Sequence, residues 1–213
     1  MRITMALTKG RLEKQTLALL ESAGYGVEKV LNKNRELILP DTKKDIDYIL
    51  VKSNDCITYV ESGAADIGVV GKDTLMEGSK DYYEMLDLER GKCSFIVASL
   101  PGVNLFEKEG HIRIGTKYPN VAREYFQSKS MDVEIIRIEG SVELSPLIGL
   151  VDGIVDIMET GTTLKANGLV VLDTICDLSA RLIVNKASFR TKKDRILEIM
   201  EDLRREIRHA ETN

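Results

Sequence analysis

The sequence predicts an α/β fold built on mainly parallel sheets. Short runs rich in Val and Ile alternate with amphipathic stretches along the chain, which is typical of βαβ units. Glycines such as Gly71 and Gly161 stand at the expected junctions, where a residue without a Cβ lets the chain turn sharply. With 43% hydrophobic and 30% charged residues, the chain can bury a sizeable core and keep a solvated surface.

The alternation predicts strands and helices in a definite order. Strands are expected at 3–7, 46–52, 66–70, 83–88, 93–100, 112–116, 133–138, 154–157, 169–174 and 180–184. Helices are expected at 12–23, 55–62, 121–129, 144–150 and 192–210. The last helix carries Ile196, Ile199, Met200 and Leu203 on one stripe, which needs a core or a partner.

The segment 99–110 suggests two lobes rather than one. It holds Pro101, two glycines and few aliphatic residues, so it is interpreted as a connection leading into a second lobe. We place the hinge near 89–92 and again near 177–178. Lobe I is then discontinuous and comprises 1–88 plus 178–213, while lobe II comprises 89–177.

Composition excludes several classes of protein. The net charge of −4 argues against a protein that coats nucleic acid. The N-terminus reaches Lys9 too soon for a secretory signal, and no later apolar run is long enough to span a bilayer. Cys56, Cys93 and Cys176 lack the spacing of a disulfide framework or a zinc site. We therefore expect a cytoplasmic protein without nucleic-acid or membrane partners.

The segment 153–164 reads as an apolar strand, a polar turn and a short helix. Successive backbone N–H groups of such a turn can converge on a phosphate, and threonine hydroxyls add uncharged donors. The residues expected to do so are Thr160, Gly161, Thr162 and Thr163. Asp156 and Glu159 suit ribose hydroxyls or Mg²⁺. The alternative is that a threonine merely caps a helix and Asp156 merely ends a strand.

A second turn of the same kind holds Glu139, Ser141 and Glu143. It could be a simple helix cap. Because the carboxyl ends of parallel strands meet at one edge of a sheet, we instead expect the two turns to form one crevice.

Basic residues also stand at expected strand ends. Lys9 and Arg11 flank a glycine, Lys52 closes the strand at 46–52, and Arg35 lies in a polar loop. Such cations can hold a pyrophosphate or a triphosphate, although solvated surface residues are the plainer alternative. Asp73 follows the strand at 66–70 and would face the same crevice. Neither G-x-x-x-x-G-K-[ST] nor G-x-G-x-x-G occurs.

Four motifs in this order resemble the ATP phosphoribosyltransferase family. They are K-G-R-L at 9–12, D-x-x-T-Y-V-x-x-G-A-A-D-I-G at 55–68, E-G-S-V-E-L at 139–144 and D-I-x-E-T-G-x-T-L at 156–164, and the likeness continues at 185–190. The resemblance implies a two-lobed periplasmic-binding-protein-like (type II) fold with the site in the interlobe cleft. It also implies transfer of the phosphoribosyl group of phosphoribosyl pyrophosphate to N1 of ATP, with release of pyrophosphate, as the first step of histidine biosynthesis.

The resemblance also implies roles for the candidate residues. The turn at 159–163 would hold the 5′-phosphate of phosphoribosyl pyrophosphate, and Asp156 would meet its ribose. The cations that would neutralise pyrophosphate and the triphosphate are Lys9, Arg11, Arg35 and Lys52. The residues that would bind ATP are Lys9, Arg11, Asp73, Glu139, Ser141 and Glu143. Mg²⁺ is expected through the substrate phosphates, which leaves open whether Asp156 or Glu159 also contacts it.

Two departures from the family pattern qualify these roles. Lys52 stands where an arginine is common, and Cys56-Ile57 replaces the usual Val-Pro. A lysine cannot form the planar, bidentate hydrogen bonds to two oxygens that an arginine forms. The length resembles the short form of the family, which implies a homodimer within a hetero-oligomer that contains a separate regulatory subunit resembling histidyl-tRNA synthetase. Inhibition by histidine would then require that partner.

Two other functions remain as alternatives. A non-catalytic ligand-binding protein can use the same two-lobed architecture, since a fold does not specify a function. Another phosphoribosyl transferase would usually place paired acids directly before T-G-G-T, whereas Ile157 and Met158 separate the acids here.

Overall fold

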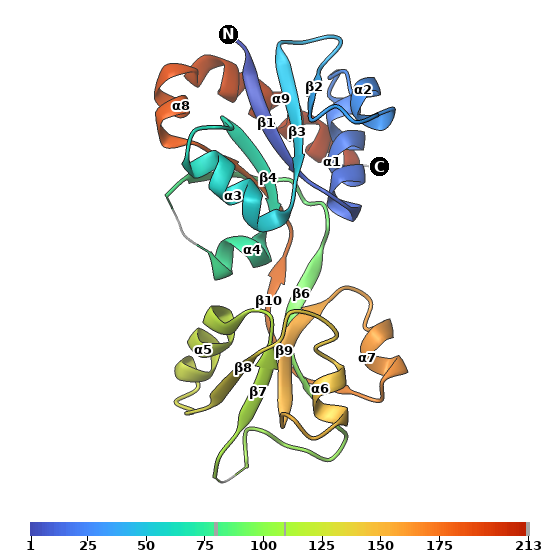
Figure 1. The fold of residues 1–213 in the computed structure, drawn as a ribbon, viewed down its shortest axis with the longest axis vertical. Coiled ribbons are helices and arrows are strands. Elements are labelled where there is room, and N and C mark those ends of the chain that lie inside the picture. Colours follow the sequence, from blue (N-terminus) through green and yellow to red (C-terminus); the bar gives the residue numbers. More distant parts are fainter. Residues whose placement is uncertain (79–80, 109, 212–213) are drawn as a thin grey trace. The chain divides into compact units, whose positions relative to one another are not determined.

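The structure, a computed structural model, describes residues 1–78, 81–108 and 110–211. The chain divides into two units. Unit 1 comprises Met1–Gly91 and Ser179–Asn213, and unit 2 comprises Lys92–Leu178. The chain therefore passes between the units twice, close to the positions 88/89 and 177/178 at which the sequence placed its lobe boundaries. Figure 1 shows each unit as a sheet with helices packed against it.

Unit 1 is built on a six-stranded sheet in the order β2-β3-β1-β4-β11-β5. Its strands are β1 (Ile3–Thr8), β2 (Ile38–Pro40), β3 (Ile46–Val51), β4 (Ile67–Gly71), β5 (Tyr83–Asp87) and β11 (Ala180–Val184). The three central strands β3, β1 and β4 are parallel, with Thr8 opposite Val51 and Leu7 opposite Val69. β2, β11 and β5 pair antiparallel towards the edges.

Helices cover both faces of this sheet. They are α1 (Arg11–Ser22), α2 (Glu28–Leu31), α3 (Ser53–Glu61), α4 (Lys72–Glu77), α8 (Lys186–Thr191) and α9 (Lys193–Glu211). Because side chains alternate along a strand, Met5 of β1 packs in one cluster with α1 and α9, while Ala6 packs in another with α3. The four residues of the α9 stripe are all buried in the first cluster. The predicted stripe thus finds its partner in the core of unit 1.

Unit 2 holds a five-stranded sheet in the order β10-β6-β9-β7-β8. Its strands are β6 (Cys93–Ser99), β7 (Arg113–Thr116), β8 (Glu134–Arg137), β9 (Gly153–Met158) and β10 (Val170–Leu178). Its helices are α5 (Pro119–Ser128), α6 (Leu144–Leu147) and α7 (Thr162–Ala166). β9, β7 and β8 are parallel, and β6 and β10 add antiparallel strands.

Each sheet contains three adjacent parallel strands, which confirms the predicted α/β class, and the differences are local. β2, α2, α4 and α8 were not predicted, because elements of three to six residues are too short to show a hydrophobic period. The predicted helix 144–150 ends at Leu147, since Gly149 turns the chain with φ 72°. The predicted strand 169–174 runs on to Leu178, because β6 pairs with it over that length.

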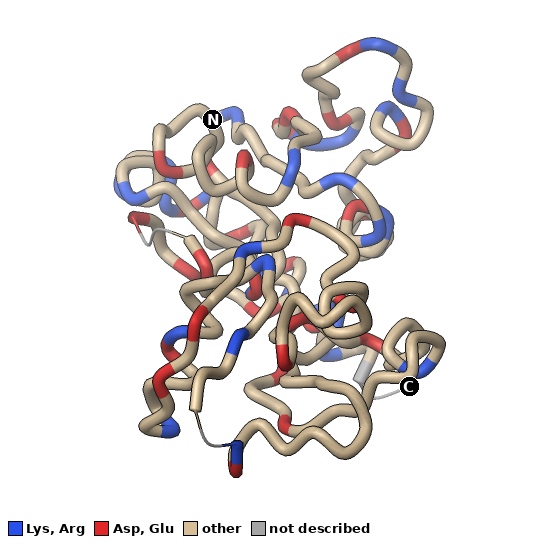
Figure 2. Tube along the Cα trace, turned by 60° about the horizontal axis from the view of Figure 1, so that its bottom comes forward, with Lys and Arg blue, Asp and Glu red and all other residues tan. Residues whose placement is uncertain are grey.

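Charged residues of both signs are interspersed along the trace in Figure 2. Within the described ranges, no helix is both long and apolar enough to cross a membrane.

Asp66 is a buried carboxylate that ties three segments of unit 1 together. Its exposed fraction is 5%. It accepts hydrogen bonds from the Thr4 backbone N–H (2.8 Å), the Ser188 hydroxyl (2.6 Å) and the Lys192 ammonium (2.8 Å). This acid of the second family motif therefore serves the fold of unit 1, joining β1 to the helices that follow β11.

Asp66→Ala should lower the free energy of unfolding on the order of 3 kcal/mol, because it removes the acceptor of the Thr4 N–H and the carboxylate that pairs with Lys192. The Lys192 ammonium then keeps the Arg2 carbonyl as an acceptor. Urea denaturation measures the change. Asp81→Ala is the control, since Asp81 forms an exposed ion pair with Lys186 and should matter by less than about 1 kcal/mol. Equal effects of the two substitutions would mean that the Asp66 network adds no stability.

Candidate functional site

In unit 2, three parallel strands end at one edge of the sheet. Thr116 of β7 lies opposite Arg137 of β8 on one side and Val155 of β9 on the other. The segments that follow these strands therefore begin side by side. They are Lys117 after β7, the turn at 138–143 after β8 and the turn at 159–163 after β9.

The turn after β9 has the conformation that its glycine permits. Gly161 adopts φ 72° and ψ 5°, in the left-handed region, and α7 begins at the next residue. The hydroxyls of Thr160 and Thr162 lie 2.9 Å apart, and the Thr162 N–H donates to Thr160 Oγ1 at 3.5 Å. Thr160, Thr162 and Thr163 are exposed. The turn thus presents several uncharged donors to solvent at the end of β9.

Asp156 lies within β9 on the face that the short helices of unit 2 cover. Alternation along the strand puts it on the side of Ile154 and Met158. Both of these pack in the apolar cluster that includes Val142 and Leu164. Asp156 is therefore a carboxylate with apolar neighbours on its own face, and it is only partly exposed.

These surroundings raise the pKa of Asp156 to about 6. Burial is the largest cause, because it disfavours the charged form. The Ile157 N–H, which donates to Asp156 Oδ1 at 2.8 Å, lowers the pKa, the negative charge of Glu143 raises it, and the positive charge of Lys117 lowers it. The structure thus brings Asp156, Glu143 and Lys117 within electrostatic reach of one another.

The turn after β8 contains Ser141, which is in the left-handed region with φ 49° although it is not a glycine. Val142 is buried and anchors the turn, and Glu143 is the N-cap residue of α6. Glu139 accepts a hydrogen bond from Arg137 Nε at 2.8 Å. Strain of this kind costs about 1–3 kcal/mol and tends to gather at functional sites.

Lys117 is a candidate that the sequence reasoning missed. The strand 112–116 was predicted, but the lysine directly after it was not singled out. The signal that could have found it is the same one that drew attention to Lys9 and Lys52, a cation at the carboxyl end of a parallel strand. Lys117 is exposed and follows β7, which lies between β8 and β9.

Unit 1 has a corresponding edge. The Lys9 N–H donates to the Val51 carbonyl at 2.9 Å, so Lys9 and Lys52 follow neighbouring strand ends. Both lysine side chains are exposed. Asp73 lies in the first turn of α4, directly after β4, so it belongs to the same edge.

The glycines beside these residues shape the edge. Gly10, with φ 104°, turns the chain from β1 into α1, which begins at Arg11. A Cβ added to Gly71 would lie 2.1 Å from Asp73 Oδ1, so only a glycine there leaves the Asp73 side chain in its place. Arg35 lies in an exposed loop before β2. Because β2 runs antiparallel to β3, the chain enters β2 at the edge where β3 ends.

The predicted site residues therefore form one group in each unit. Lys9, Lys52 and Asp73 share an edge of unit 1, where Arg11 and Arg35 flank them, and Asp156, Glu143 and the threonine turn share an edge of unit 2. Across residues 1–78, 81–108 and 110–211, no group of three or more His, Cys, Asp or Glu side chains could hold a metal ion by itself.

Comparison of the sequence with known proteins gives a consistent result. The family model described as ATP phosphoribosyltransferase (HisG) matches residues 52–205. An ATP phosphoribosyltransferase from Clostridium acetobutylicum is 57% identical over 202 residues, which cover 95% of this chain and 94% of the relative. One from Clostridium novyi is 53% identical over 206 residues, covering 96% and 97%.

Solved structures agree with the sequence comparison. The ATP phosphoribosyl transferase (HisG:HisZ) complex from Thermotoga maritima has a chain that superimposes with a TM-score of 0.82 at 35% identity, covering 97% of this chain and 99% of that one. The periplasmic aliphatic sulphonate binding protein SsuA from Escherichia coli matches with a TM-score of 0.63 at 10% identity, covering 97% and 72%. The second match confirms the periplasmic-binding-protein-like fold. Since a model of the family spans residues 52–205 and close relatives span nearly the whole length, this chain belongs to the ATP phosphoribosyltransferase family.

Proposed function

We propose that this chain transfers the phosphoribosyl group of phosphoribosyl pyrophosphate to N1 of ATP and releases pyrophosphate, as the first step of histidine biosynthesis. The observation that carries the proposal is the edge of unit 2, where a threonine turn with a left-handed glycine follows a strand that bears Asp156. Membership of the family supports the same reaction.

The edge of unit 2 would bind the sugar phosphate. The hydroxyls and N–H groups of Thr160, Gly161, Thr162 and Thr163 can donate to phosphate oxygens without adding charge. Asp156 can accept hydrogen bonds from ribose hydroxyls, and Glu159 stands at the start of the turn. An anion bound at the turn would also be attracted to Lys117, the cation that follows the adjacent strand.

The edge of unit 1 would stabilise the leaving group and the triphosphate. N1 of adenine carries a lone pair and attacks C1 of the sugar, while the C1–oxygen bond breaks and its electrons leave with pyrophosphate. The charge on that oxygen grows in the transition state, so Lys9, Arg11, Arg35 and Lys52 would bind the transition state more strongly than the ground state. Lys52 contributes a compact charge rather than the planar fork of an arginine. Asp73, Glu139, Ser141 and Glu143 would contact ATP.

Mg²⁺ is the proposed cofactor, because it binds through substrate phosphates and one or two carboxylates while keeping several waters. The carboxylate oxygens of unit 2 suit this mode of coordination. Asp156 and Glu159 offer carboxylate oxygens beside the turn, and the described residues do not form an all-protein cage. When bound, the ion would neutralise charge on the departing pyrophosphate.

We further propose that a homodimer of this chain joins a separate regulatory subunit resembling histidyl-tRNA synthetase in a hetero-oligomer, and that the enzyme works in the cytoplasm. The similarity to a protein solved as a HisG:HisZ complex supports the first part. Light scattering of the chain alone and with such a subunit would test it, and a mixture that stays at the mass of the separate components would contradict it.

The decisive assay mixes the purified protein with ATP, phosphoribosyl pyrophosphate and Mg²⁺. The transferase should produce phosphoribosyl-ATP and one pyrophosphate for each turnover. A ligand-binding protein of the same fold would produce neither, and another phosphoribosyl transferase would release pyrophosphate only with a different acceptor.

Thr163→Ala should raise the KM for phosphoribosyl pyrophosphate about tenfold, the effect of losing one hydrogen bond to a charged group. The KM for ATP should stay nearly constant, because the turn is assigned to the sugar phosphate. Gly161→Ala should act in the same direction, since it disfavours φ 72° and crowds Met158 Sδ at 3.3 Å. Steady-state kinetics with each substrate varied in turn measure the effects. Thr191→Ala, on the exposed end of α8, is the control, and equal changes in both KM values would remove the assignment.

Lys117→Met should also raise the KM for phosphoribosyl pyrophosphate about tenfold, because a charge-assisted contact to an anion is lost. Lys117→Arg should keep most of the affinity, since the charge remains. Isothermal titration with phosphoribosyl pyrophosphate measures binding apart from turnover. The matched control is Lys165→Met, an exposed lysine on α7. If Lys117→Met binds as tightly as this control, Lys117 has no part in the site.

A further inference from the structure

Unit 2 contains a cavity of about 450 Å³ at the edge of its sheet opposite to the candidate substrate residues. Arg113 is the first residue of β7, and Asp152 directly precedes β9. The chain beyond β6 also reaches this place, because β6 runs antiparallel to β9. Asp152 and Glu159 lie seven positions apart along extended chain, a distance of roughly 20 Å. The cavity is therefore separate from the threonine turn.

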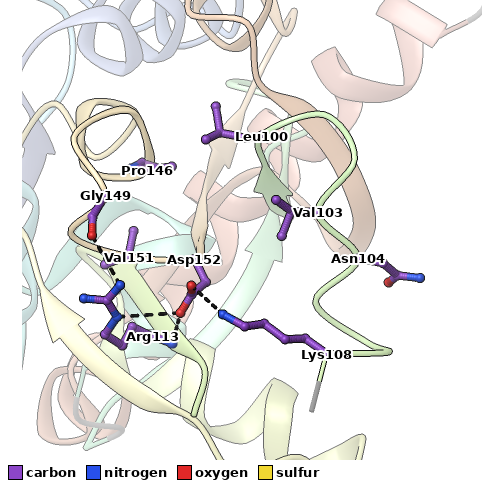
Figure 3. A pocket seen from close by; sticks show the side chains of 9 residues that line it. All are labelled: Leu100, Val103, Asn104, Lys108, Arg113, Pro146, Gly149, Val151 and Asp152. Carbon is purple, nitrogen blue, oxygen red and sulfur yellow. Dashed lines mark hydrogen bonds and ion pairs between the residues drawn. The ribbon is translucent and has the colours of Figure 1, made fainter. Parts of the chain in front are cut away.

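The cavity has an apolar part and a charged part. Figure 3 shows the side chains of Lys108, Asp152 and Arg113 gathered together, with Leu100 and Pro146 away from them. Val103 and Val151 add further aliphatic lining. Ligand sites of proteins commonly combine such a mostly apolar lining with a few polar groups, in volumes of about 300–1,000 Å³.

The charged part of the lining has a net charge of +1, because it holds two cations, Lys108 and Arg113, and one carboxylate, Asp152. Asp152 Oδ1 accepts from Lys108 Nζ at 2.6 Å, and Oδ2 accepts from the Arg113 backbone N–H at 2.8 Å. Arg113 Nε lies 3.7 Å from Oδ2. Burial opposes ionisation of Asp152, but these bonds and the two cations outweigh it and lower its pKa. Asp152 is thus ionised at neutral pH and holds both cations in place.

Donors remain on both cations. A lysine ammonium has three N–H donors, and Lys108 uses one on Asp152. Arg113 Nη2 donates to the Gly149 carbonyl at 3.2 Å, so the guanidinium is held by Gly149 and Asp152 along one side. The side chains of Lys108 and Arg113 are each 37% exposed, so an incoming anion can reach them. The arrangement is an oriented pair of cations rather than two mobile surface residues.

A purely structural role would explain the ion pairs, which pin the segment after β6 to the strand starts. It would leave the apolar side of the pocket without a role, where Leu100, Val103 and Val151 offer a ligand aliphatic surface. We propose that this cavity binds a small organic acid, with its carboxylate on Lys108 and Arg113 and its apolar body against Leu100, Val103 and Val151. A monoanion fits best, since the single excess charge matches it and Asp152 would repel a second negative charge.

The test uses the full chain and sodium 3-phenylpropionate as the probe, with uncharged 3-phenyl-1-propanol as the comparison. In ¹H–¹⁵N spectra the acid should cause saturable shifts of the backbone amides of Arg113, Gly149 and Asp152. The alcohol should bind at least about tenfold more weakly, which corresponds to about 1.4 kcal/mol. Equal binding of acid and alcohol would overturn the assignment of the carboxylate. No saturable shift, or shifts confined to the threonine turn, would overturn the site.

Two variants refine the test. Arg113→Gln and Lys108→Met should each weaken binding of the acid at least about tenfold, to the level of the alcohol. Lys108 lies on the segment after β6, outside the sheet, so its loss leaves the strands intact even if Arg113→Gln disturbs the start of β7. Arg123→Gln is the control, because Arg123 is exposed on α5 and donates to Asn120. Unchanged affinity in Lys108→Met and Arg113→Gln would contradict the proposal. Since the readout is binding, the result is independent of transferase activity.

Discussion

Lys9→Met should lower kcat/KM of the transferase by about a hundredfold to a thousandfold, the effect of removing one donor that stabilises developing charge. Lys9 follows β1 directly, and its backbone N–H is fixed to Val51 at the end of β3. Lys9 therefore stands at the carboxyl end of the middle one of the three parallel strands of unit 1, and Lys52 follows the neighbouring strand. Loss of this charge should weaken binding of the transition state more than binding of either substrate. Most of the decrease in kcat/KM should therefore come from a lower kcat.

The fold of Lys9→Met should be unaffected, because the exposed side chain leaves and the backbone hydrogen bond stays. Its urea midpoint should match that of the unaltered protein. Lys14→Met is the matched control, since Lys14 is an exposed lysine on α1 one turn further along the chain. If both substitutions leave kcat/KM unchanged, the cations of unit 1 do not stabilise the leaving group.

The sequence predicted the parts of the fold that show themselves locally. The turn at 159–163 could be found because a glycine, three threonines and an apolar strand occur together. The stripe of α9 could be found because it repeats over several turns, and the structure buries it against β1 and α1. In both places the local pattern and the final packing agree, which is the usual sign of a consistent sequence.

The elements and residue roles that the sequence did not predict depend on contacts between residues far apart in the chain. No local pattern near Ile38 predicts an edge strand, because β2 forms only through its pairing with β3. Asp66 belongs to a motif that points to chemistry, yet its partners Ser188 and Lys192 lie more than a hundred residues away and make it structural. Lys117 does carry a local signal, a cation after a predicted strand, but only the pairing of β7 with β8 and β9 places it at the same edge as Asp156.

Asp156→Asn should lower kcat/KM for phosphoribosyl pyrophosphate about a hundredfold at pH 8, because an amide accepts ribose hydroxyls less strongly than a carboxylate. The unaltered enzyme should also lose activity as the pH falls below about 6, the pKa to which burial raises Asp156. The pH profile of Asp156→Asn should lack this acidic limb. Rates measured from pH 5 to 8 test both points. If Asp156→Asn still loses activity at acidic pH, that loss reflects the titration of another ionisable group.

The same substitution should stabilise the protein at neutral pH. A pKa raised from 3.8 to about 6 means that the folded state binds the proton more tightly than the unfolded state, so stability falls as the pH rises from about 4 to 6. The amide removes this cost, which is about 1–2 kcal/mol after allowance for the part of the side chain that water reaches. Asp156→Asn should therefore unfold at higher urea than the unaltered protein at pH 7, and the gain should shrink towards pH 4. Asp132→Asn, at an exposed aspartate, should change neither activity nor stability. If Asp156→Asn is instead less stable at pH 7, then the Ile157 N–H and Lys117 influence the pKa of Asp156 more strongly than burial does.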